Sequence, residues 1–324
     1  MRPIVLVLRA LGLGDFATGV PALRAVRRAY AGHEVVLAAP AALAPLLASA
    51  GVVDRHLVTP THVRHPVRRV PWARAAPPAV AVNLHGRGPQ STAALQAVGP
   101  GRLLAFASAE VGFDCGPEWR PGEHEVTRWC RMLGWYGITA DPDDLDLPPP
   151  PAPRPQSPAA VVVPLAAGTV LVHPGAAGPE RRWPVDRYAA VAAALQAAGH
   201  PVLVTGSDAE VELAEAVAAA AALPAESAVA GRTDLAELAW LVANARLLVC
   251  GDTGVAHLAT AYGTPSVVLF GPMSPAEWGP PPGRGQHVAL WRGPHGLTDI
   301  GVPDVLAAAG SALTAAAPGR ASSG

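Results

Sequence analysis

Short runs of apolar residues alternate with Ala- and Leu-rich stretches along the whole chain. In the first half the pattern predicts strands over residues 4–8, 34–38, 80–84 and 103–106, and helices over 21–30, 41–50 and 126–136. In the second half it predicts strands over 170–173, 201–205, 247–251 and 266–270, and helices over 185–198, 209–221, 235–243, 255–262 and 303–316. Such alternation is typical of parallel βαβ units.

A proline run interrupts this alternation near the middle of the chain. Residues 148–155 read Pro-Pro-Pro-Pro-Ala-Pro-Arg-Pro, and proline removes a backbone donor and fixes φ, so this stretch fits neither a helix nor a central strand. We interpret residues 148–158 as a linker between domains spanning 1–157 and 158–302, with a terminal helix and disordered tail over 303–324. The predicted fold class is α/β, with two Rossmann-like doubly wound domains facing across a cleft.

Composition narrows the class of protein further. Half of the residues are hydrophobic and 15% are charged, which supplies buried cores and argues against general disorder. The net charge of −1 gives no overall attraction to nucleic acid and allows at most a peripheral membrane contact. The 3 cysteines form neither a disulfide framework nor a zinc-binding spacing. Residues 4–8 are too few for a signal or spanning segment, so we expect a cytoplasmic monomer.

A glycine-rich loop follows the first predicted strand. Gly12, Gly14 and Ala17 fit the permissive dinucleotide pattern G-x-G-x-x-A. Asp15 would place a carboxylate where a pyrophosphate rests, and Ala38 stands near the expected position of a ribose-binding acid, so NAD is disfavoured. Asp15 could instead take a proton from an acceptor hydroxyl, or simply cap the next helix.

The segment after the strand at 170–173 has the features of an anion-binding loop. His173-Pro174-Gly175 and the small residues after it let backbone amides approach an anion closely, and Arg181 and Arg182 add fixed positive charge. This arrangement would suit a departing diphosphate, on which negative charge builds as a glycosidic bond breaks. A solvated arginine pair beside a helix start is the alternative.

The stretch around residue 252 is the most informative part of the sequence. A strand runs directly into a helix whose first-turn amides, with Thr253 and Gly254, could hold a phosphate. Asp252 and His257 lie at the opening of this helix and within it. Asp252 could otherwise be a helix N-cap and His257 a core residue.

Two segments of the first domain are candidates for binding an acceptor. His85, Arg87 and Gln90 follow the strand at 80–84 and could hydrogen-bond a polyol. Residues 61–74 form a basic stretch that includes Arg64 and Arg68, which could bind an acidic acceptor or remain a solvated loop.

Together these motifs resemble the heptosyltransferase family, glycosyltransferase family 9, of the GT-B architecture. The resemblance rests on four segments: residues 12–15, 173–175 with 181–184, 251–254 with His257, and 269–272. It implies inverting, metal-independent transfer from a nucleotide sugar, typically ADP-heptose, with no cofactor. By this resemblance Asp15 matches the general base.

The resemblance also assigns donor contacts. Thr253 and Gly254 match the diphosphate-binding turn, and Asp252 matches a residue near the donor sugar. Arg181 stands where the family usually has a phosphate-binding lysine, and all 24 basic residues of this chain are arginine. Glu210 is a candidate for the ribose hydroxyls, with Asp208 as its rival. The expected donor-binding set is completed by Gly14, His173, Gly175, Arg182 and His257.

The predicted activity is therefore a glycosyltransferase that moves a sugar, expected to be heptose, onto a hydroxyl of a saccharide or small-metabolite acceptor. Three alternatives stay open at this stage: a sugar-nucleotide epimerase or hydrolase of the same fold, a non-catalytic nucleotide-sugar-binding protein, and the disfavoured NAD-dependent oxidoreductase. The sequence does not decide the acceptor.

Overall fold

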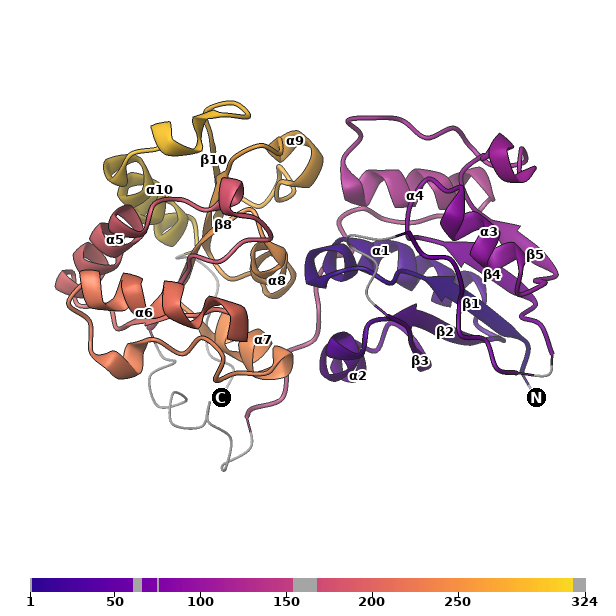
Figure 1. Cartoon of the computed structure of the whole chain (residues 1–324), viewed down its shortest axis with the longest axis horizontal. Coiled ribbons are helices and arrows are strands. Elements are labelled where there is room, and N and C mark those ends of the chain that lie inside the picture. Colours follow the sequence, from indigo (N-terminus) through magenta and orange to yellow (C-terminus); the bar gives the residue numbers. More distant parts are fainter. Residues whose placement is uncertain (1, 61–65, 75, 154–167, 317–324) are drawn as a thin grey trace. The chain divides into compact units, whose positions relative to one another are not determined.

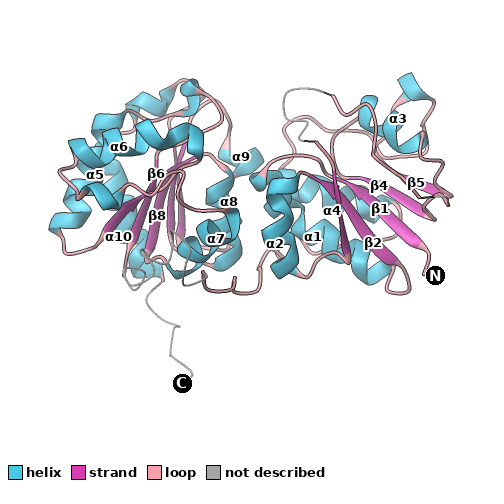
Figure 2. Cartoon of the chain, turned by 60° about the horizontal axis from the view of Figure 1, so that its bottom comes forward, coloured by secondary structure: helices cyan, strands magenta, loops and turns pink. Residues whose placement is uncertain are grey.

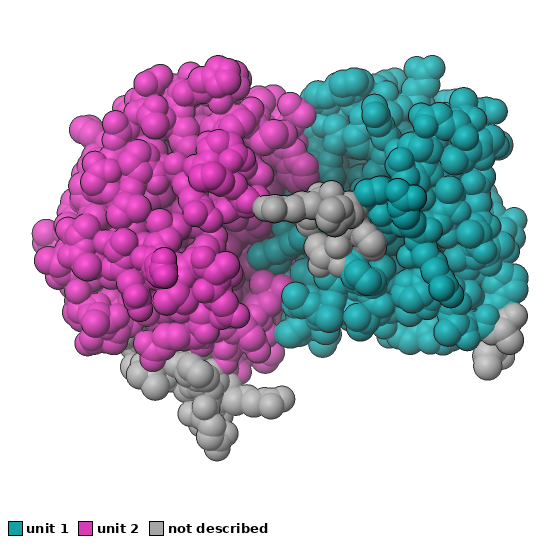
Figure 3. Space-filling model, in the orientation of Figure 1, with its two compact units in different colours: residues 1–145 teal, residues 146–324 magenta. Residues whose placement is uncertain are grey.

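The computed structural model describes residues 2–60, 66–74, 76–153 and 168–316 of the chain. The chain divides into two compact units, Met1–Leu145 and Asp146–Gly324, which are coloured separately in Figure 3. This division falls just ahead of the proline run. The predicted domain boundary after residue 157 lies outside the described residues.

Unit 1 is built around a parallel sheet with helices between its strands (Figure 1). Its strands are β1 (Ile4–Leu8), β2 (Glu34–Ala39), β3 (Arg55–Val58), β4 (Val80–Asn83) and β5 (Arg102–Leu104). Its α-helices are α1 (Leu13–Ala29), α2 (Ala44–Ala50), α3 (Gln90–Gln96) and α4 (Glu125–Trp135). The strand order is β3-β2-β1-β4-β5, so the chain reverses its direction of winding between β1 and β4.

The strands of unit 1 are apolar because both faces of the sheet are covered. On one face, Leu6 and Leu8 of β1 lie in a buried cluster with Ala94 and Leu95 of α3. The two longest helices of unit 1, α1 and α4, pack against each other. Burial of every residue of β1 and β4 explains why these segments read as continuous apolar runs.

Unit 2 repeats this architecture. Its strands are β6 (Val170–His173), β7 (Val202–Val204), β8 (Leu247–Gly251), β9 (Ser266–Phe270) and β10 (His287–Trp291). Its α-helices are α5 (Val185–Ala197), α6 (Val211–Ala220), α7 (Leu235–Asn244), α8 (Gly254–Tyr262), α9 (Pro275–Trp278) and α10 (Val302–Ala315). All strand pairs are parallel in the order β10-β9-β8-β6-β7, with the reversal between β6 and β8.

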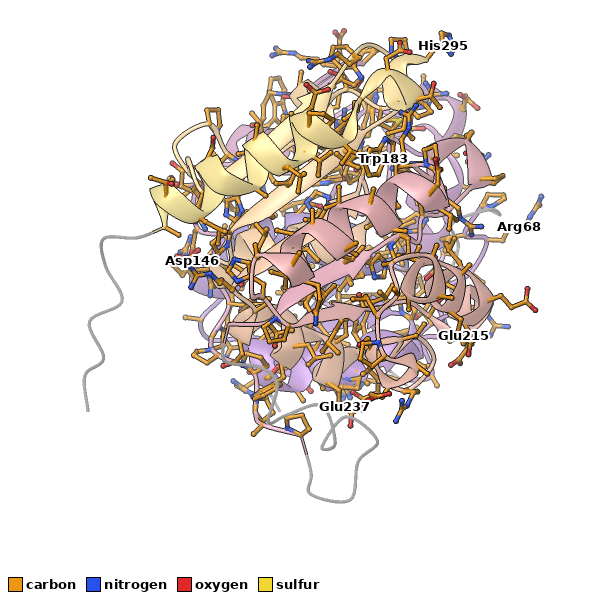
Figure 4. The ribbon with its side chains drawn as sticks, turned by 90° about the vertical axis from the view of Figure 1, so that its left-hand side faces the viewer. Arg68, Asp146, Trp183, Glu215, Glu237 and His295 are labelled. Carbon is orange, nitrogen blue, oxygen red and sulfur yellow. The ribbon has the colours of Figure 1, made fainter. Side chains whose placement is uncertain are left out.

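Helices cover both faces of the second sheet. Figure 2 shows α5, α6 and α10 on one face and α7 and α8 on the other. Trp183, labelled in Figure 4 near the start of α5, is 2% exposed and donates its Nε1 proton to the carbonyl oxygen of Ile300 at 3.0 Å. Its ring meets that of Tyr188 edge-on, with centroids 5.0 Å apart. Trp183 thereby joins the start of α5 to the segment that leads into α10.

The structure confirms the predicted fold class of two doubly wound α/β domains, but several elements differ from the sequence-based prediction. Helix α1 begins at Leu13 rather than at Pro21, because the buried face of Phe16, Ala17 and Val20 outweighs the hydrogen bond that Pro21 cannot make. Strand β3 was not predicted, since it contains Arg55 and His56 and lies at a sheet edge. No helix in the described part of the chain is both long and apolar enough to cross a membrane.

Gly116 offers a test of how tightly unit 1 is packed. A Cβ atom at this position would lie 2.1 Å from the carbonyl oxygen of Ala105, which is backbone and cannot move aside easily. We expect Gly116→Ala to lower the free energy of unfolding by about 1–3 kcal/mol, measured by chemical denaturation. The control is Gly134→Ala in α4, where a Cβ atom meets nothing within 4 Å and helix propensity should improve. Equal stabilities of the two variants would contradict the packing.

Candidate functional site

Asp15 lies in the first turn of α1, just after the carboxyl end of β1. Its Oδ2 atom accepts a hydrogen bond from the amide of Gly12 at 3.2 Å, and its side chain is 25% exposed. Asp15 therefore caps α1 and also remains open to solvent. The capping alternative and the proposed proton-accepting role both fit this geometry.

The surroundings of Asp15 make its carboxylate more basic than that of a free aspartate. Burial raises the pKa of Asp15, the nearby Arg9 guanidinium lowers it, and the negative charge of Glu125 raises it again. The net result is a pKa above 3.8. A carboxylate with a raised pKa is a better proton acceptor for a hydroxyl group.

Arg9 and Glu125 are two residues of this region that the sequence reasoning missed. The Arg9 side chain is 1% exposed and its Nη2 atom lies 3.9 Å from Oδ1 of Asp15. The Glu125 side chain is 6% exposed and pairs with Arg9 at 3.1 Å. The sequence contains one signal for Arg9: it is a charged residue directly after the fully apolar strand at residues 4–8.

His85 lies against the loop between β1 and α1, just before Asp15. It follows β4, and its Nδ1 atom accepts a hydrogen bond from the amide of Ala10 at 3.2 Å. Arg87 and Gln90, the other acceptor-binding candidates of this segment, are exposed. The carboxyl ends of β1 and β4, where unit 1 reverses its winding, are the position at which doubly wound folds bind ligands.

The basic stretch is only partly described. Arg68 is exposed and lines a surface hollow together with Arg69, Trp72 and neighbouring prolines. Arg64 lies outside the described residues.

In unit 2, Arg181 and Asp252 form an ion pair. The Nη2 atom of Arg181 donates to the carboxylate of Asp252 and, at 3.0 Å, to its carbonyl oxygen. Asp252 is 5% exposed, and Thr253 rather than Asp252 is the N-cap of α8. A Cβ atom at Gly251 would lie 3.3 Å from the carbonyl oxygen of Arg181, so a glycine here lets the Arg181 segment cross the end of β8 closely.

A second group of predicted donor residues meets at the ends of β6 and β7. The carboxylate of Glu210 packs against Gly175: a Cβ atom at position 175 would lie 2.1 Å from Oε1 of Glu210. Glu210 also accepts hydrogen bonds from the amide and hydroxyl of Ser207, both at 2.8 Å. His173 is buried, and its Nδ1 atom lies 3.0 Å from Oγ1 of Thr205.

The remaining donor candidates are less closely joined to these groups. Arg182 is exposed and makes one long contact, 3.4 Å, with the carbonyl oxygen of Ala176. His257 is half-buried and its ring lies edge-on to Trp278 at 6.0 Å. The carbonyl oxygen of Gly14 accepts from the hydroxyl of Thr18 at 2.9 Å in the first turn of α1. Across the described residues, no group of three or more His, Cys, Asp and Glu side chains is placed to hold a metal ion.

Comparison with known proteins decides the family. The sequence profile of glycosyltransferase family 9 (heptosyltransferase) matches residues 120–295, more than half of the chain. The chain belongs to glycosyltransferase family 9. Among its family 9 relatives, lipooligosaccharide heptosyltransferase 2 of Haemophilus influenzae is 38% identical over 114 residues, and lipopolysaccharide heptosyltransferase 2 of Escherichia coli is 36% identical over 112. Each match spans 33% of this chain and 32% of the relative.

Solved structures share the fold of this family 9 chain over nearly its whole length. The glycosyl transferase family 9 protein from Veillonella parvula has a TM-score of 0.75 at 17% identity, covering 96% of this chain and 97% of its own. Escherichia coli ADP-heptose lps heptosyltransferase II has a TM-score of 0.72 at 22% identity, covering 97% and 99%. At these identities the likeness establishes the fold.

His173 gives a prediction about ionisation at this site. Burial lowers the pKa of its imidazole, and the carboxylate of Glu210 opposes this in part. We expect the pKa of His173 to lie below the 6.5 of a free histidine. An NMR titration measures it, and a His173→Asn variant assigns the signal. Because the unfolded state gains the proton first, His173 should reduce stability as pH falls through 6.5. A midpoint at or above 6.5 would contradict this environment.

Proposed function

We propose that this chain is an inverting, metal-independent glycosyltransferase that moves a sugar, heptose from ADP-heptose, onto an acceptor hydroxyl. Two observations, one in each unit, carry the proposal: Asp15 is a partly exposed carboxylate with a raised pKa after the carboxyl end of β1, and Arg181 lies beside the start of α8. Family membership supports the reaction class. The relatives named heptosyltransferases, and a similar fold solved as "E. coli heptosyltransferase WaaC with ADP", support the donor.

The start of α8 is the proposed site for the diphosphate. The first-turn amides of a helix have no carbonyl partner within the helix, and the helix dipole favours an anion there. Thr253 is in an extended conformation at the N-cap and its side chain makes no capping hydrogen bond, so its hydroxyl adds a polar group at this end. Gly254 is the first helical residue and brings its backbone close without a side chain.

Arg181 supplies the positive charge beside this helix start. Its pairing with Asp252 holds the guanidinium in place, and a bound diphosphate would share it. The Asp252 carboxylate, at the edge of the same turn, then accepts hydrogen bonds from hydroxyls of the donor sugar. Glu210, whose carboxylate lies against Gly175, would accept hydrogen bonds from the ribose hydroxyls. His173, Arg182 and His257 complete the proposed donor set.

Asp15 is the proposed base for a single displacement. The acceptor hydroxyl gives its proton to the Asp15 carboxylate while its oxygen bonds to the anomeric carbon. The bond between that carbon and the diphosphate oxygen breaks, and the electron pair leaves with the nucleoside diphosphate. Negative charge grows on the leaving group, and Arg181 and the α8 amides stabilise it. One displacement inverts the anomeric configuration.

His85 is the strongest acceptor-binding candidate because its ring lies beside the loop that leads into α1 and Asp15. Arg87 and Gln90 are exposed nearby on the same segment and could bind further hydroxyls. Arg68 would contribute if the acceptor carries phosphate or carboxylate groups. A saccharide, such as the lipopolysaccharide on which the named relatives act, or a small metabolite would fit these groups.

A catalytic Asp15 predicts a specific kinetic defect. We expect Asp15→Ala to lower turnover by roughly 10²–10⁴-fold while leaving donor affinity nearly unchanged, since the carboxylate acts on the acceptor proton. Protonated Asp15 cannot accept a proton from the acceptor hydroxyl, so the wild-type rate should fall as the pH is lowered through the pKa of Asp15. Because this pKa is raised, the fall should occur at a higher pH than for a free aspartate. Asp114→Ala, at an exposed position of unit 1, is the matched control. Full turnover by the Asp15 variant would remove it as the base.

Arg181 and Asp252 predict opposite effects on the binding of free ADP. Arg181→Ala should weaken ADP binding by about 1.5–3 kcal/mol, the scale of a hydrogen bond to a charged group. Asp252→Asn should tighten ADP binding, because a negative charge beside the diphosphate is lost, but weaken the sugar nucleotide relative to ADP. Calorimetric titration measures both.

The control for these two variants is Arg246→Ala. Arg246 is exposed and stands at the amino end of β8, whereas Asp252 follows its carboxyl end. This variant should bind ADP as the wild type does. If Arg181→Ala also leaves ADP affinity unchanged, Arg181 is not part of the donor site.

A further inference from the structure

The buried guanidinium of Arg9 joins three segments that meet next to Asp15. It donates hydrogen bonds to the backbone carbonyls of Asp15, on α1, and of Leu84, which follows β4. It also donates to the hydroxyl of Thr18 at 3.2 Å and to the carboxylate of Glu125, on α4, at 3.1 Å. Each of the three guanidinium nitrogens of Arg9 therefore has a hydrogen-bond partner, and only 1% of the side chain is exposed.

The two helices that flank Arg9 leave room for it. A Cβ atom at Gly19 of α1 would lie 2.8 Å from Nε of Arg9, so any larger residue would press on the guanidinium. On the other side, the guanidinium carbon lies 5.1 Å from the centre of the Trp129 ring on α4. The Nε1 atom of Trp129 donates to Glu125 at 2.7 Å, which fixes the carboxylate that faces Arg9.

Charges of alternating sign surround Asp15 on the elements packed near it. Arg9 carries a positive charge 3.9 Å from Oδ1 of Asp15. On α4, Glu125 pairs with both Arg9 and Arg128. His85, on the segment after β4, is another titratable group, and its ring accepts a hydrogen bond from the amide of Ala10. His124, the residue before α4, adds a further titratable ring at the start of that helix.

The effects on ionisation follow from this arrangement. Burial raises the pKa of Asp15, Arg9 lowers it and Glu125 raises it, with a net increase. Burial also raises the pKa of Glu125, but Arg9, Trp129 and Arg128 outweigh it and hold the pKa of Glu125 below its usual value. Glu125 is therefore ionised at neutral pH and offsets part of the positive charge that Asp15 experiences.

We propose that Arg9 is the positioning residue of the base Asp15, and that Glu125 sets the base strength of Asp15 by neutralising part of the Arg9 charge. This inference rests on the proposed function, in which Asp15 accepts the acceptor proton. Neither Arg9 nor Glu125 touches the reacting atoms. Both act through Asp15: Arg9 by holding its backbone and favouring its ionised form, Glu125 by limiting that preference.

Two substitutions of opposite sign test the inference. Arg9→Met removes the positive charge and should raise the pKa of Asp15 by about 1–3 units, the usual effect of an opposite charge within a few ångströms. Glu125→Gln removes the negative charge while keeping the shape, and should lower the pKa of Asp15 by about one unit. Arg9→Lys restores the charge and should reverse most of the Arg9→Met shift. A general loss of packing cannot move one group in both directions.

The readout is the ionisation of Asp15 itself, followed by NMR in protein labelled with carbon-13 at the aspartate carboxyl groups. An Asp15→Asn variant assigns the signal, and the acid limb of kcat/KM provides the kinetic counterpart. The matched control is Arg131→Met, which removes an α4 arginine that pairs with Glu123 at 2.6 Å. This variant should leave the titration of Asp15 unchanged.

Gly19→Ala tests the same arrangement without removing a buried charge, in case the charge-removing variants do not fold. It alters no charge and improves helix propensity within α1, yet it presses on the guanidinium of Arg9. The pKa of Asp15 should rise, by less than in Arg9→Met. Shifts of the same sign in Arg9→Met and Glu125→Gln, or an unshifted Asp15 in the folded variants, would overturn the inference. If the shifts appear as expected but Asp15→Ala keeps full turnover, the proposed function fails and the charge arrangement stands.

Discussion

The parallel strand order constrains everything else in this molecule. In a doubly wound sheet all strands end at one edge, and the two central strands at the reversal lead to crossovers on opposite sides, which leaves their ends uncovered. In unit 1 these strands are β1 and β4, which are followed by the first turn of α1 with Asp15 and by His85. In unit 2 they are β6 and β8, followed by the His173 loop and the Asp252 turn. Residues far apart in the sequence are thereby brought to one edge of each sheet.

Both edges place an arginine against a carboxylate that has a proposed chemical role. Arg9 lies next to Asp15 and is neutralised by Glu125, while Arg181 is neutralised by Asp252. Removing one member of a buried ion pair leaves an uncompensated charge, so such pairs are sensitive to substitution. In unit 1 the same charges also shift the pKa of the carboxylates, because Arg9 lowers the pKa of both Asp15 and Glu125, and Glu125 raises that of Asp15. Stability and function are therefore coupled at both positions.

The sequence predicted the features that local pattern determines. Central strands such as β1 and β8 are buried on both faces and appear in the sequence as apolar runs. Asp15 and Thr253 became candidates because each follows such a strand. The edge strands β5 and β7 were also predicted, whereas the edge strands β3 and β10 were not; in β3 the polar residues Arg55 and His56 interrupt the apolar pattern. The Arg9–Glu125 and Arg181–Asp252 contacts join residues 116 and 71 positions apart, and no local periodicity encodes such a distance. The partners of a buried charge emerge only when the fold is known.

The most direct measurement of the central claim, that this family 9 chain is a nucleotide-sugar-dependent transferase, is a calorimetric binding panel on the purified protein. The panel comprises ADP, UDP, GDP, dTDP and NAD. NAD is included because the glycine loop after β1 also fits the dinucleotide-binding pattern. The account predicts selective binding of ADP. A preference for another nucleoside diphosphate would preserve the reaction class and discard ADP-heptose as the donor. Binding of NAD alone would contradict the account and the role given to Asp15.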